Sequence, residues 1–154
     1  MNFLKKQSAG SWISILTAIL TLVSLIVYAV NIGGAGYFQG ASVSNLVLCC
    51  VIVIVLLAAV VAIAQVKGNN PVLKLVSGLC QIAVPALLAL CLINLIAARA
   101  EGLGFIYFSN PDVILEVQTP ANLASATGTI VNMVCLGITT LLGMVAAFFT
   151  VKTK

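Results

Sequence analysis

Residues 11–31 read SWISILTAILTLVSLIVYAVN, an apolar segment that small polar groups interrupt at regular intervals. The gaps between these polar positions alternate between three and four residues, and the positions are Ser14, Thr17, Thr21, Ser24, Tyr28 and Asn31. On an α-helix this spacing places all of these side chains on one face. A helix that is apolar except for one stripe of hydroxyl groups is typical of a transmembrane helix that packs its polar face against other helices.

The composition indicates that lipid is the solvent of most of this chain. Of its 154 residues, 62% are hydrophobic and only 6% are charged, whereas soluble domains contain about 25% charged residues. Three acids, seven bases and no histidine offer little for proton relays, metal binding or acid–base catalysis. We therefore expect a protein that is not an enzyme, holds no cofactor or metal, and binds no nucleic acid.

The apolar segments predict an all-α integral membrane protein with a single domain, residues 1–154. Its four spans cover about 11–30, 45–66, 72–98 and 123–151, with outer loops at 31–44 and 99–122 and a cytoplasmic turn at 67–71. Short connections predict an antiparallel four-helix bundle. A cleavable signal peptide ending at Ala35 is the alternative interpretation of the first span, although its apolar part exceeds the usual length of such signals.

Charge placement predicts the orientation of the bundle. If the chain crosses the membrane four times, all six lysines share the side of both termini, and Arg99 and the three acids share the other side. Basic loops face the cytoplasm in most membrane proteins. We therefore expect both termini in the cytoplasm and the loop at 99–122 outside, with Arg99 reaching toward the interface.

The fourth span carries a second stripe of small and polar residues, which includes Asn132, Thr139 and Gly143. Because the first and fourth spans run antiparallel, we expect their stripes to meet. Asn94 and Asn132 lie in the outer third of their spans and are expected to bond to each other or to the first span. The same first-span hydroxyls could instead line a pore in an oligomer.

Two features inside the spans have mainly structural interpretations. Pro85 lies near the middle of the third span, removes a backbone donor and predicts a kink, with a gating hinge as the less favoured reading. Five cysteines all fall in apolar segments and lack a C-x-x-C pair. They fit small buried hydrophobic residues better than a redox centre.

The loop at 99–122 is the most distinctive part outside the spans. Its pattern, FIYF, then a Ser-Asn-Pro-Asp turn, then VILEVQ, predicts a short β-hairpin. Thr119 and Pro120 predict the start of the last helix. An aromatic patch is expected from both outer loops, either resting on lipid headgroups or docking another protein; its members are Tyr37, Phe38, Phe105, Tyr107 and Phe108.

No motif identifies a family. The plan of four spans with both termini inside resembles several unrelated tetraspan groups, a resemblance that implies no function. The favoured hypothesis is a non-enzymatic accessory or assembly subunit in a bacterial cytoplasmic (inner) membrane, whose partners are the lipid bilayer and other membrane subunits or further copies of itself. The alternative is a homo-oligomeric channel or facilitator for small, weakly charged solutes, lined by the first helix.

Overall fold

The computed structural model describes residues 8–66 and 70–149 and consists of helices within those ranges. The long helices are α1 (Ala9–Gly33), α2 (Leu46–Ile63), α3 (Pro71–Phe108) and α5 (Pro120–Phe148), and a short α4 (Pro111–Val117) joins the last two. Each long helix is long and apolar enough to cross a membrane. The prediction of four long apolar helices is confirmed, and these helices indicate a multi-pass membrane protein.

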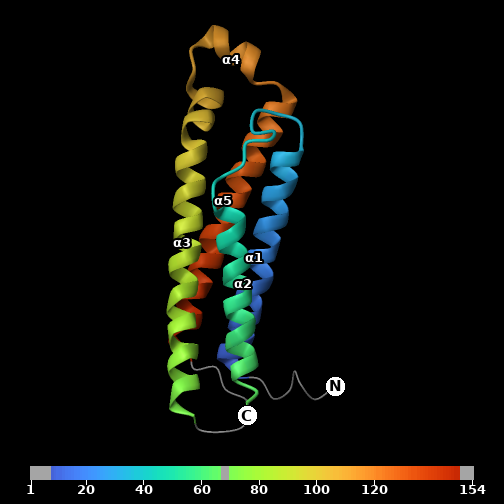
Figure 1. Ribbon diagram of the computed structural model, residues 1–154. Helices are drawn as coiled ribbons and strands as arrows, with labels where there is room; N and C mark the ends of the chain where they lie inside the picture. Colours follow the sequence, from blue (N-terminus) through green and yellow to red (C-terminus); the bar gives the residue numbers. More distant parts are fainter. Residues whose placement is uncertain (1–7, 67–69, 150–154) are drawn as a thin grey trace.

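The four long helices form a bundle in which each packs chiefly against two neighbours. Helix α5 contacts α1 and α3, and α2 contacts the same two helices from the other side. The start of α1 and the end of α5 lie at one end of the bundle, here named the termini end (Figure 1). The opposite end, here named the loop end, carries the connection between α1 and α2 together with α4.

Three of the helices begin with a side-chain N-cap followed by proline. The side chains of Asn70, Asn110 and Thr119 each accept a hydrogen bond from a backbone amide of the following turn, and each is followed by proline. A capping oxygen satisfies an otherwise unpaired amide, and proline fits the first helical position because it has no amide hydrogen to lose. The start predicted at Thr119 and Pro120 is confirmed.

The predicted β-hairpin is wrong, because residues 105–108 form the last turn of α3 and residues 111–117 form α4. Helix α3 continues past residue 98 because Arg99, Gly102 and Ile106 repeat at helical spacing and are all buried. Asn110 then caps α4, accepting from the Val113 amide at 3.0 Å. The predicted turn at 67–71 and the last residues of the span predicted to end at 151 lie partly outside the described residues.

Helices α1 and α5 bury stripes with a seven-residue repeat. In α1 the stripe runs through Gly10, Ser14, Thr17, Thr21, Ser24 and Tyr28, and in α5 through Ser125, Thr129, Asn132, Leu136, Thr139, Gly143 and Ala146. A sustained alternation of three and four residues keeps one seam of each helix facing its partner along the whole contact. Small side chains let the two backbones approach closely.

Larger apolar side chains from α2, α3 and α5 fill the centre of the bundle. Val53, Leu57, Leu88 and Leu136 belong to one cluster of buried residues together with Cys50 and Cys91. All five cysteines are free thiols, and the sulfur atoms of Cys50 and Cys91 lie 3.8 Å apart.

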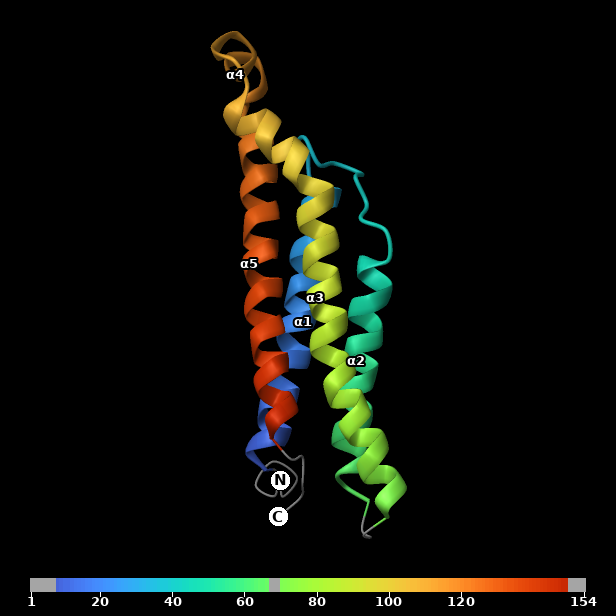
Figure 2. The ribbon, with the colours of Figure 1, turned by 90° about the vertical axis from the view of Figure 1, so that its left-hand side faces the viewer.

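Helix α3 remains continuous through Pro85, and its loop-end part leans toward α5 (Figure 2). A methyl group on Gly143 of α5 would lie 3.3 Å from the Leu88 Cδ1 atom and 3.7 Å from the Pro85 Cα atom. Glycine at this position therefore allows the close contact between α5 and the middle of α3.

Candidate functional site at the loop end

A polar junction around Asn31 joins α1, α5 and the connection at residues 34–45. The Asn31 Nδ2 atom donates to the Thr129 hydroxyl at 2.7 Å, and the Ser125 hydroxyl donates to Asn31 Oδ1 at 3.3 Å. If the amide is turned over, its nitrogen reaches the Ser125 backbone carbonyl at 3.1 Å. The Ser125 hydroxyl also accepts from the backbone amide of Phe38 at 3.2 Å. Either amide orientation therefore ties the end of α1 to α5.

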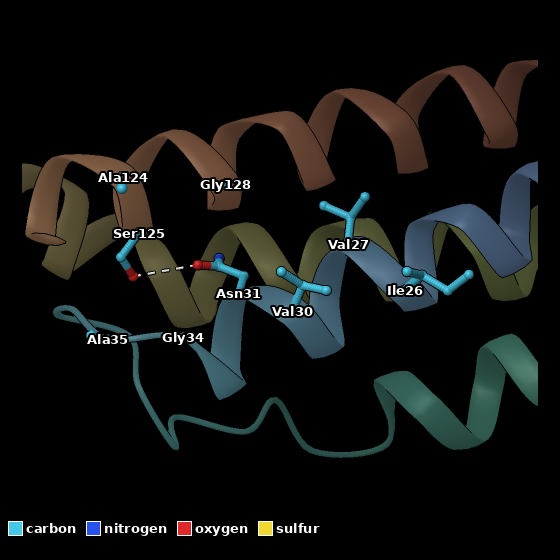
Figure 3. Close-up of a pocket in the computed structure, with 9 residues that line it drawn as sticks. All are labelled: Ile26, Val27, Val30, Asn31, Gly34, Ala35, Ala124, Ser125 and Gly128. Atoms are coloured by element: carbon cyan, nitrogen blue, oxygen red, sulfur yellow. Dashed lines mark hydrogen bonds between the residues drawn. The ribbon is translucent and has the colours of Figure 1, made fainter.

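Figure 3 shows this junction at the edge of a groove of about 360 Å³ between α1 and α5. Asn31 and Ser125 point toward each other, and most of the remaining lining is apolar or glycine. The side chains of Asn31 and Ser125 bond to each other. The other lining residues therefore present an apolar surface to the groove. Its chemistry suits hydrocarbon better than a polar substrate.

Arg99 is buried beneath the connection at residues 34–45. Its Nη2 atom donates to the Ala41 carbonyl, and its guanidinium carbon lies 4.6 Å from the centre of the Phe38 ring. The side chain is only 3% exposed and forms no ion pair within the described part of the chain. The guanidinium is thus covered by protein, and its position relative to the membrane interface stays a prediction. The guanidinium anchors the connection by a charge-assisted hydrogen bond and a cation–π contact.

The path of this connection depends on two glycines and one tyrosine. Gly36 has φ +132°, and a methyl group there would lie 2.5 Å from the Ala121 carbonyl oxygen. A methyl group on Gly102 of α3 would lie 2.6 Å from the Phe38 Cε1 atom. The Tyr28 hydroxyl accepts from the Val43 amide. Together these contacts hold the connection against the loop end of the bundle.

The predicted aromatic patch divides into a buried and an exposed part. Phe38 is buried, and half-buried Tyr107 packs against its cluster. Tyr37 contacts the Phe38 ring edge-on at a centroid distance of 5.2 Å and the Phe105 ring at 5.9 Å. Phe105 and Tyr37 are about two-fifths exposed, whereas Phe108 is 86% exposed.

The hydroxyl stripe of α1 is buried in the bundle and is mostly bonded within its own helix. Ser14, Thr17 and Thr21 donate to the carbonyl four residues earlier at 2.8 to 2.9 Å. Thr139 of α5 does the same at 2.6 Å. Such bonds satisfy a hydroxyl without a partner helix. This part of the stripe therefore contributes close packing of α1 within the bundle.

Asn132 departs from this pattern. It is 1% exposed, and neither atom of its amide bonds to any described group; the Ser24 hydroxyl is also unpaired there. Ser24 lies seven residues before Asn31 on α1, and Asn132 lies seven residues after Ser125 on α5. Because the two helices are antiparallel, Ser24 and Asn132 fall in the same layer, two helical turns from the Asn31 and Ser125 pair. Asn94 is exposed on the outer surface of α3, so it does not form the expected bond to Asn132.

Sequence reasoning missed three loop-end features, two of which carried recognisable signals. The burial of Arg99, Gly102 and Ile106 follows a helical spacing that continues from Leu95. Asn110 before Pro111 is the same helix-start signal that was recognised at Thr119 before Pro120. The exposure of Leu115, at 84%, depends on α4 being a helix and was hidden by the hairpin interpretation.

No protein-family model, curated protein sequence or solved structure matches this chain.

Proposed function

We propose that this chain is a non-enzymatic membrane protein that acts as an accessory or assembly subunit. It docks onto another membrane protein through residues 99–122, here named the tip. The observation that carries this proposal is the exposure of Phe108 and Leu115, at 86% and 84%, on a part of the molecule that projects beyond the rest of the bundle. Exposed large apolar side chains outside the bilayer favour a protein contact.

The length of α3 supports placing the tip outside the hydrocarbon layer. Its 38 residues correspond to about 57 Å, whereas the hydrocarbon core is about 30 Å thick. Helix α2 begins beside Cys91, whose sulfur lies 3.8 Å from the Leu46 carbonyl oxygen. The stretch of α3 from Cys91 to Phe108 therefore extends about 25 Å past the start of α2.

Hydrogen bonds within the tip fix its segments relative to one another. The Gln118 side chain donates to the Ile106 carbonyl at 3.0 Å, and the Asn122 side chain donates to the Val117 carbonyl at 2.8 Å. Apolar groups presented on a fixed support lose little entropy when a partner covers them. This supports docking over loose contact with lipid headgroups.

The buried hydroxyl stripe supports packing over pore lining by α1. Ser14, Thr17 and Thr21 are buried within one protomer and bond to their own helix, so a channel along this stripe would require α1 to turn this face away from the bundle interior. The placement of the lysines in the sequence supports cytoplasmic termini and an outward tip. A bacterial cytoplasmic membrane is the location that we propose.

The test is extraction of the native particle in mild detergent, with its subunits identified by mass. We expect a stoichiometric foreign subunit with the wild-type chain and its loss from the double variant Phe108→Ser, Leu115→Ser. Glu101→Gln, an exposed change on the same part of α3, is the matched control and should keep the partner. Retention of the partner by a folded double variant would contradict docking through the tip.

A further inference from the structure

A second and larger groove lies between α1 and α2 in the termini half of the bundle. Its volume is about 650 Å³, within the range of about 300–1,000 Å³ typical of ligand sites. Nine of its eleven lining residues are apolar, and the polar ones are Ser14 and Gln65. Small side chains, among them Ala18, Ala58 and Ala62, leave this space between two helices that contact each other elsewhere.

The groove extends over about half of the membrane thickness. Its lining runs from Ser14 to Leu22 on α1 and from Gln65 back to Ile54 on α2, which corresponds to about 12 to 17 Å along the helices. One leaflet contributes about 15 Å of hydrocarbon. A partner helix would have to cross both leaflets, so the extent of the groove matches one acyl chain better than a helix.

The polar end of the groove lies where a lipid headgroup would be. Trp12, in the first turn of α1, is 46% exposed just before Ser14, and exposed tryptophan is typical of the interface. The Ser14 hydroxyl is bonded to the Gly10 carbonyl at 2.9 Å. The Gln65 Nε2 atom is buried and donates to no described group, so it is free to bond an ester or phosphate oxygen.

The sequence that flanks α1 and α2 on this side is basic. Lys67 follows Gln65 by two positions, and Lys5 and Lys6 precede α1. Positive charge near the membrane surface attracts anionic lipids. The charge of these segments therefore complements an anionic phospholipid.

From these observations we infer that the groove between α1 and α2 binds one acyl chain of an anionic phospholipid, with its headgroup beside Gln65. This site is separate from the tip and does not depend on the proposed docking function. It gives the chain a specific lipid ligand in the leaflet at its termini end.

The test uses protein reconstituted in vesicles of phosphatidylcholine and phosphatidylglycerol at about 4:1, then extracted in mild detergent for native mass measurement. We expect wild-type protein to retain one phosphatidylglycerol per chain. Ala58→Phe fills the groove and should lower the amount of retained phosphatidylglycerol at least tenfold. Gln65→Leu should lower retention about fivefold because it removes one hydrogen-bond donor. Val55→Phe, on the exposed surface of α2 outside the groove, should retain the lipid fully.

A photo-crosslinking residue at Leu22 keeps the inference testable if Ala58→Phe does not fold. In the same vesicles, the share of its lipid crosslinks that go to phosphatidylglycerol should exceed the share of phosphatidylglycerol in the vesicle. For the same crosslinking residue at Val55, the two shares should be equal. Equal lipid retention by wild type and a folded Ala58→Phe would overturn the inference. A crosslink from Leu22 to a second copy or to a foreign protein would also overturn it. Loss of lipid with the tip partner retained separates this site from the docking surface.

Discussion

The two halves of the bundle are held together by different forces. At the loop end, side chains bond across elements: Asn31 to Thr129, Tyr28 to Val43 and Arg99 to Ala41. In the termini half, the hydroxyls of α1 bond within their own helix. Among the described residues there, Gln81 of α3 donates to the Phe149 carbonyl at the end of α5, at 3.2 Å. Directional bonds specify one arrangement, whereas packing of small residues leaves room for a groove.

The largest effect should come from closing the space that the connection at 34–45 needs. Gly36→Ala places a methyl group against the Ala121 carbonyl at a φ of +132°, so we expect a loss of about 3 kcal/mol in the free energy of unfolding. Gly40→Ala is the control, because Gly40 has φ +68° but open space around it, and about 1 kcal/mol is expected. Denaturant titration in detergent measures both, and equal losses would contradict the close approach at Gly36.

Removal of the buried guanidinium should release the same connection without unfolding the helices. Arg99→Leu loses the hydrogen bond to Ala41 and the contact with the Phe38 ring, together about 2 kcal/mol. Hydrogen exchange of the amides at 36–46 should become about thirtyfold faster, while α2 and α5 stay protected. Glu101→Gln should leave exchange unchanged. Unaltered exchange in Arg99→Leu would mean that the connection is held by other contacts.

Half-buried Asn31 and buried Asn132 should respond differently to the same substitution. Asn31→Leu removes bonds to Ser125 and Thr129 and should cost about 1 kcal/mol. Asn132→Leu removes a buried amide that has no partner within the described residues and should be neutral or stabilise by up to about 1 kcal/mol. Unfolding of both variants in detergent is the measurement, and a large loss for Asn132→Leu would reveal a bond that its layer forms in the membrane.

The smallest effect should be found in the termini half. Thr21→Val keeps the shape of the side chain and removes a hydroxyl bonded to the Thr17 carbonyl of the same helix at 2.8 Å. We expect a change below about 0.5 kcal/mol in the same unfolding assay. A loss as large as that of Asn31→Leu would show that hydroxyls of this half also specify packing, and the contrast between the halves would disappear.

The spans could be predicted because membrane helices need long apolar runs, and the meeting of α1 with α5 because both stripes follow a seven-residue repeat. The tip could not be predicted by the same rule, since the alternation in VILEVQ fits a strand as well as a short helix. The cap formed by Asn110 before Pro111 decides between them. The helical spacing from Leu95 indicates the face of α3 on which Arg99 lies. The partner of its guanidinium, the Ala41 carbonyl, belongs to a connection distant in sequence that no local pattern reports.

The most direct test of the account is the composition of the particle that contains this chain in its own membrane. When the particle is extracted directly into nanodiscs, its mass should equal that of this chain plus a stoichiometric foreign membrane subunit. A crosslinking residue placed at Phe108 or Leu115 should join to that subunit. A particle made only of this chain, as a monomer or a closed ring, would contradict the accessory role.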